Sequence, residues 1–152
     1  MMAVVIPTTM MAGTCDMHYQ TTYRTNPDGE TAWKLRNYVA GNAQLVVDST
    51  GMEAHEDQLA AFAKGAECSS ETRQHTISMA NEYPVDELAE AGRSVAEDSL
   101  DGPYMVGIHN PDDGNAHIHI AEFSQRERGT DFDIHAVRES LETHIPDDPT
   151  AW

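Results

Sequence analysis

Residues 104–124 read YMVGIHNPDDGNAHIHIAEFS. Two segments within them, residues 104–109 and 117–123, have the apolar runs and the alternation that are typical of strands. The NPDDGN segment between them consists of residues that turns prefer. Because a short connection joins antiparallel neighbours, these residues predict an antiparallel pair of strands.

The residues on either side extend this pair to an α+β fold. A strand is predicted over 75–79, an amphipathic helix over 85–100, and a further helix over 133–144 after the pair. The order is the β-α-β-β-α of RRM-like and ferredoxin-like cores, in which strand 75–79 returns through the helix to pair in the same sheet. We therefore expect an antiparallel sheet with helices on one face.

The first half of the chain carries weaker signals. We expect one domain over residues 1–152, with its core over 73–145 and an N-terminal segment over 1–45. The elements predicted in the first half are a strand over 3–6 that Pro7 ends, a helix over 30–40, a strand over 44–47 and a helix over 53–64.

Composition gives the chain an acidic character. Its 152 residues include 9 Lys and Arg against 26 Asp and Glu, a net charge of −17, and 39% hydrophobic residues. That hydrophobic share is enough for a core, which excludes a disordered acidic tail. The scattered acids resemble the composition of proteins from salt-in halophiles, and we expect molar salt, with a Debye length of about 3 Å, to relieve their mutual repulsion. A cytosolic acidic protein that avoids nucleic acid is the alternative.

The sequence contains no targeting or membrane signal. Its two cysteines, Cys15 and Cys68, are too few for a disulfide framework and form no metal-type pair. The first residues lack the basic region of a signal peptide, and no apolar run approaches the roughly 18 residues of a membrane span. We expect a cytoplasmic protein without a membrane segment.

Three histidines lie around the predicted turn. His117 and His119 alternate on one strand and so point to the same face, while His109 ends the neighbouring strand. The hairpin brings the three imidazoles together, and three neutral imidazoles with open positions suit a divalent ion used in catalysis. Packing or hydrogen bonding without a metal is the alternative. His75 begins a strand of the same sheet and is a candidate to orient a ligand histidine.

Residues 104–124 resemble the three-histidine motif of plasmid-mobilisation relaxases of the HUH endonuclease superfamily, in particular the MobA and agrobacterial T-DNA relaxase type. In that family an acidic turn follows the first histidine, and a His-hydrophobic-His strand follows the turn. The RQHTISM segment over 73–79, the acidic helix and the Gly-Pro-Tyr lead-in keep the family's order. The resemblance covers 73–124 well and the first half only loosely. The spacing from His109 to His117 is one residue longer than the family's, so either Asp112 or Asp113 is its acidic partner.

The resemblance implies an HUH endonuclease-like fold and a metal-dependent enzyme that nicks single-stranded DNA. In such relaxases a tyrosine attacks a phosphodiester and forms a 5′-phosphotyrosyl intermediate, with Mg²⁺ or Mn²⁺ as the ion and Zn²⁺ as a further candidate. The implied partners are single-stranded DNA at a plasmid origin of transfer and an accessory DNA-binding protein. The family's tyrosine precedes the histidines, which points to Tyr38, with Tyr23 and Tyr19 as alternatives. A core role is the other interpretation of Tyr38.

Four of the nine basic residues lie near these candidates in the sequence. Lys34 and Arg36 flank Tyr38, and Arg126 and Arg128 follow the His117 strand. We expect these four side chains to contact DNA. If the protein works in molar salt, counterion release contributes little, and binding has to rest on hydrogen bonds and base stacking.

Three other functions stay open. A HIT-type nucleotide hydrolase also has alternating histidines, but Ala121 stands where a third should follow. A non-catalytic relaxase-like domain that binds a metal or a partner protein is the second, since no helicase or partner domain follows Trp152 in this sequence. A rolling-circle replication initiator is the third.

Overall fold

The computed structural model describes residues 3–12, 15–79, 83–109, 116–125 and 133–144, with side chains from residue 18 onward. Within these ranges the elements follow one another in the order β1 (Ala3–Ala12), β2 (Cys15–Thr25), α1 (Gly29–Ala40), β3 (Leu45–Asp48), α2 (Glu56–Glu67), β4 (Glu71–Met79), α3 (Val85–Ser99), β5 (Tyr104–His109), β6 (His117–Ser124) and α4 (Ile134–His144). No helix in the described ranges is long and apolar enough to cross a bilayer.

The strands form one open antiparallel sheet in the order β1-β2-β4-β6-β5-β3. The predicted pair over 104–109 and 117–123 is confirmed as β5 and β6, with His109 directly opposite His117. The predicted return of strand 75–79 is also confirmed, because β4 lies beside β6 and α3 connects it to β5. The α+β class and the antiparallel sheet therefore agree with the sequence.

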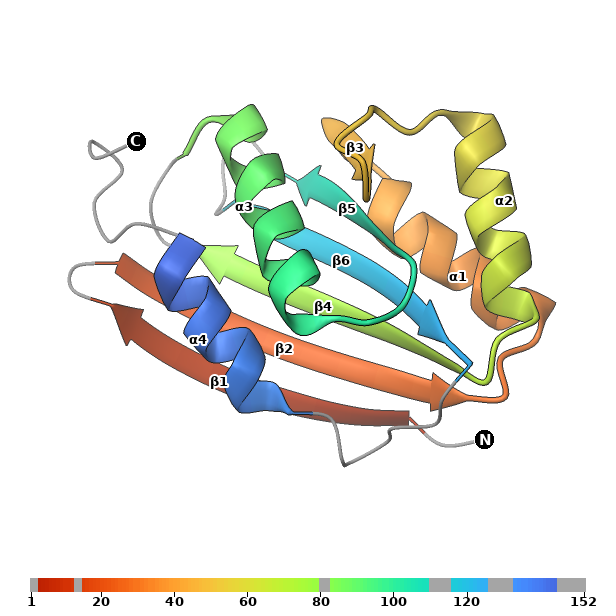
Figure 1. The fold of residues 1–152 in the computed structure, drawn as a ribbon, viewed down its shortest axis with the longest axis horizontal. Coiled ribbons are helices and arrows are strands. Elements are labelled where there is room, and N and C mark those ends of the chain that lie inside the picture. Colours follow the sequence, from red (N-terminus) through yellow and green to blue (C-terminus); the bar gives the residue numbers. More distant parts are fainter. Residues whose placement is uncertain (1–2, 13–14, 80–82, 110–115, 126–132, 145–152) are drawn as a thin grey trace.

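Helices cover both faces of the sheet, so the expectation of helices on one face is wrong. Figure 1 views the sheet from the side that α3 and α4 cover. One buried apolar cluster joins these helices to the sheet, and a second joins α1 and α2 to its other face. The reason lies in β5, where Val106 packs with the first cluster and Met105 with the second. A strand with apolar side chains on both faces of the sheet requires helices packed on both faces to shield them from water.

A glycine lets α1 lie close to the sheet. A Cβ atom on Gly107 of β5 would lie 2.0 Å from the backbone oxygen of Val39, near the end of α1. Only a residue without a side chain allows this approach. The last turn of α1 thus lies directly over β5 and β6, beside the histidines.

The main element that sequence reasoning missed is β2. Three of its side chains on the α3 and α4 side, Tyr19, Thr21 and Tyr23, are buried although none is aliphatic. The first strand also continues past Pro7, because an edge strand tolerates a residue without an N–H.

Helix α2 begins three residues after its predicted start. Residue 58 explains this, since the His55 backbone N–H donates to the Gln58 side chain at 3.0 Å and so caps the helix at residue 55. Helix α1 matches its prediction closely, because Asp28 accepts the Thr31 N–H at 2.8 Å and fixes the first turn.

Candidate functional site

The hairpin register brings the three histidines together. His109 and His117 are direct cross-strand partners, and His119 lies opposite Gly107. All three side chains share the face that α1 covers. The ring centres of His109 and His119 are 4.0 Å apart, and those of His117 and His119 are 6.1 Å apart.

Backbone carbonyls of α1 hold two of the rings. His119 Nδ1 lies 2.9 Å from the Tyr38 carbonyl oxygen, and His109 Nε2 lies 3.4 Å from that of Val39. A carbonyl only accepts, so these nitrogens carry the protons and His119 Nε2 keeps a free lone pair. His117 Nδ1 pairs with the Ser78 hydroxyl at 2.9 Å.

The cluster is neutral at physiological pH. Burial lowers the pKa of His119 to about 4, with smaller contributions from the two neighbouring imidazoles. Burial also lowers the pKa of His109 and of His117 below the ordinary histidine value. Neutral imidazoles are the form in which histidine binds a metal or accepts a proton.

The three histidines line an open groove of about 480 Å³, which we call the histidine groove. Its other described lining residues are all neutral and polar. They are Gln20, Asn42, Gln44, Thr76 and Ser78. None of the described lining residues is a carboxylate, although the chain has 26 acidic residues.

The donor atoms suit a metal ion, but their orientations do not form a metal site. Ligand histidines commonly donate one ring N–H to a carbonyl, as His119 does here. However, His109 and His119 stack with 21° between their planes, so their in-plane lone pairs run side by side instead of meeting at one point. Among the described residues, no group of three or more His, Cys, Asp and Glu side chains is placed to hold a metal. The predicted partners Asp112 and Asp113 lie outside the described residues.

Tyr38 lies beside the cluster, but its hydroxyl is engaged elsewhere. Its ring stacks on His119 at 4.5 Å. The hydroxyl donates to the backbone oxygen of His75 and pairs with the Thr76 hydroxyl at 2.6 Å. Burial raises the pKa of Tyr38 above the ordinary tyrosine value. As it stands, this hydroxyl ties α1 to β4 and is a weak nucleophile.

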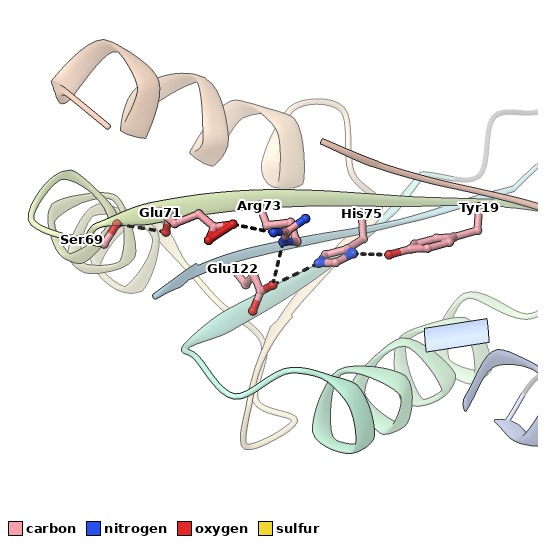
Figure 2. A network of polar contacts seen from close by, with 6 residues as sticks. All are labelled: Tyr19, Ser69, Glu71, Arg73, His75 and Glu122. Carbon is pink, nitrogen blue, oxygen red and sulfur yellow. Dashed lines mark hydrogen bonds and ion pairs between the residues drawn. The ribbon is translucent and has the colours of Figure 1, made fainter. Parts of the chain in front are cut away.

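Tyr19, Tyr23 and His75 lie on the opposite face of the sheet. The assignment of His75 as a residue that orients a groove histidine is therefore wrong, because successive side chains of a strand alternate and Thr76 is the one that faces the groove. Figure 2 shows the His75 ring between the Tyr19 hydroxyl, 2.7 Å from Nδ1, and Glu122, 3.3 Å from Nε2. This placement also separates Tyr19 and Tyr23 from the histidine groove.

Sequence reasoning missed the buried charges in the same network. Arg73 donates to Glu71, lies 3.7 Å from Glu122 and covers the Tyr23 ring at 5.1 Å, while all three charged side chains are at most 1% exposed. Charges at alternate positions of a strand ordinarily indicate a solvent face. The sequence therefore held no signal that these charges are internal.

Lys34 and Arg36, two of the four basic residues expected to contact DNA, are not among the described lining residues of the histidine groove. Lys34 forms an exposed ion pair with Glu30 at 3.2 Å. Arg36 pairs with Glu56 and lies over the Trp33 ring at 5.0 Å. Arg126 and Arg128 lie outside the described residues.

Comparison of this chain with models of protein families, with curated proteins and with solved structures finds no match.

Proposed function

We propose that the chain is a relaxase-type enzyme with an HUH endonuclease-like fold, which nicks single-stranded DNA at a plasmid origin of transfer. The observation that carries the proposal is the meeting of His109, His117 and His119 on one face of the sheet, in an open groove beside Tyr38. The resemblance of residues 104–124 to the relaxase motif supplies the reaction class.

The groove residues have distinct roles in this proposal. His119 presents Nε2 because its Nδ1–H is held by the Tyr38 carbonyl. The three imidazoles would hold a divalent ion only after the His109 and His119 rings leave their stacked arrangement. When bound, Mg²⁺ or Mn²⁺ supplies a Lewis acid for the scissile phosphate. The Thr76 and Ser78 hydroxyls supply neutral donors that bind a phosphate without adding charge.

Tyr38 is the nucleophile in this proposal, because of the three predicted tyrosines it alone lies on the face of the groove. The reaction requires its hydroxyl to leave the His75 carbonyl and Thr76. The phenolic oxygen then bonds to phosphorus while the bond to the 3′-oxygen of the preceding nucleotide breaks. The tyrosine loses one proton and the 3′-oxygen gains one, so protons and charge balance.

A nicking assay tests the proposal. The full chain is incubated in molar KCl with Mg²⁺ or Mn²⁺ and a labelled pool of single-stranded DNA, and covalent protein–DNA adducts are separated on a denaturing gel. Wild type should form an adduct, whereas His117→Ala and Tyr38→Phe should not. Tyr104→Phe is the matched control, because its hydroxyl bonds to Glu97 at 2.6 Å and its ring packs with the cluster of α3 and α4. If wild type forms no adduct with either metal, the enzyme proposal fails.

One observation favours a second function, a non-catalytic domain that binds a metal or a partner. The Tyr38 hydroxyl is occupied by the His75 carbonyl and the Thr76 hydroxyl. Calorimetric titration with Mn²⁺ or Zn²⁺ separates the two functions. Binding that His117→Ala abolishes, in a protein that forms no adduct, supports the non-catalytic domain.

A further inference from the structure

A second pocket lies on the same face of the sheet as the histidine groove. It has a volume of about 260 Å³ and lies between strands β2 and β4 and helix α1. Its described lining residues are Thr22, Tyr23, Arg24, Thr31, Lys34, Thr72 and Gln74. We call it the Arg24 pocket. The cross-strand partners Arg24 with Thr72, and Thr22 with Gln74, form its floor.

The Arg24 pocket and the histidine groove share one floor. Thr72 and Gln74 of β4 line the pocket, and Thr76 and Ser78, the next two residues on the same face, line the groove. The midpoint of Thr72 and Gln74 is four strand residues from the midpoint of Thr76 and Ser78. This separation corresponds to about 13 Å along β4. Strand β2 runs alongside in the same way, with Gln20 in the groove. An extended chain of a few nucleotides spans this distance.

The chemistry of the pocket fits a phosphate group. Its described lining contains two cations, three threonines, one glutamine and no carboxylate, although acids outnumber bases 26 to 9 in the chain. Arg24 already donates to the Thr31 hydroxyl at 3.3 Å, so its guanidinium is held toward α1. The nearby acids are engaged: Asp28 caps α1 and Glu30 forms an exposed pair with Lys34. An exposed pair of this kind is weak and exchanges readily for another anion.

We infer that the Arg24 pocket binds a phosphate group of a single-stranded nucleic acid whose chain continues along β2 and β4 into the histidine groove. The inference rests on the proposed function for its nucleic-acid ligand. In this inference Arg24, Lys34 and Gln74 bind the nucleic acid, at a place separate from the three histidines.

Two substitutions of equal charge test the inference. Gln74→Glu places a carboxylate on the pocket floor, and its side chain still accepts from the Thr22 hydroxyl, as Gln74 does at 3.4 Å. Gln58→Glu adds the same charge on α2, where the side chain keeps its bond to the His55 N–H. Binding of fluorescein-labelled oligothymidine is measured by anisotropy in EDTA. Gln74→Glu should weaken binding about fivefold or more relative to Gln58→Glu, since like charges in contact repel by about 1 kcal/mol or more.

A salt titration gives a second readout. Removing one phosphate-binding cation reduces the steepness of log K against log [KCl] by about 0.7 for a single strand. Arg24→Gln should show this decrease, whereas Lys64→Gln should keep the wild-type slope, because Lys64 lies on α2 outside the pocket. Circular dichroism of each variant checks that it is folded.

The outcomes separate this inference from the proposed function, because the assay contains no metal and no cleavage step. Equal binding by Gln74→Glu and Gln58→Glu overturns the inference, whether or not nicking occurs. If wild type binds inorganic phosphate but no oligonucleotide, and Gln74→Glu weakens phosphate binding, the pocket is a site for free anions and the nucleic-acid assignment is wrong. Binding of neither probe also overturns it. Weaker binding by Gln74→Glu supports the inference even in a protein that does not nick DNA.

Discussion

The buried imidazole of His119 should make the protein sensitive to acid. Its pKa in the folded state is about 4, against 6.5 for an ordinary histidine. The unfolded chain therefore takes up a proton at this residue as the pH falls below about 6.5, while the folded chain does so only near pH 4. The contribution of the neutral ring to the free energy of unfolding is fully present above about pH 6.5 and is lost through this window.

The size of the effect follows from the same two values. Each tenfold change in proton affinity is worth about 1.4 kcal/mol, which gives about 3 kcal/mol for a fully buried ring. His119 is only partly buried, so we reduce the figure to about 2 kcal/mol for solvent screening. His119→Asn removes the titrating ring and leaves an amide N–H that can donate to the Tyr38 carbonyl.

Urea unfolding at constant molar KCl, followed by circular dichroism between pH 7 and pH 4, measures this difference. Carboxylates titrate over the same range in wild type and variant, so the quantity of interest is the difference between their free energies of unfolding. We expect wild type to lose about 2 kcal/mol relative to His119→Asn across the window. His135→Asn, which removes an exposed imidazole on α4, is the matched control. A wild-type-to-His119→Asn difference that stays constant with pH would refute the claim that burial keeps this histidine neutral.

Three further predictions concern the buried ion network, the contact of α1 with the sheet, and the net charge. Arg73→Met removes a buried cation from Glu71 and should cost about 3–5 kcal/mol in urea unfolding; a decrease smaller than about 1 kcal/mol would mean that the pair behaves as a surface pair. Gly107→Ala forces a methyl group against the Val39 carbonyl and should lower the free energy of unfolding by about 1–3 kcal/mol. The control is Gly29→Ala, whose methyl group meets only the flexible end of a glutamate side chain. Equal decreases in the free energy of unfolding would argue against the close approach of α1. With a net charge of −17, the melting temperature should rise steadily from low to molar KCl, and a fall would contradict the interpretation that the acidic residues adapt the fold to salt.

The hairpin and the shared face of its histidines could be predicted because both follow from local rules. Turn residues between two apolar segments predict antiparallel neighbours, and a period of two places His117 and His119 on one face whatever the rest of the chain does. These rules need only the residues 104–124. The same alternation rule predicts that His75 and Thr76 lie on opposite faces of the sheet. It does not predict which of the two faces carries the histidine groove.

Other features depend on contacts between residues far apart in the sequence. Glu71, Arg73 and Glu122 look like solvent-exposed charges until β2, β4 and β6 lie together and bury them. The protonated nitrogen of His119 is chosen by a carbonyl of α1, which lies 81 residues earlier. The alternating pattern of a strand predicts which side chains share a face. The burial, proton positions and pKa values of those side chains depend on what packs against that face. For this chain, the sequence was sufficient to bring three histidines together, and only the packing of α1 through Gly107 established that they are neutral and how their rings are oriented.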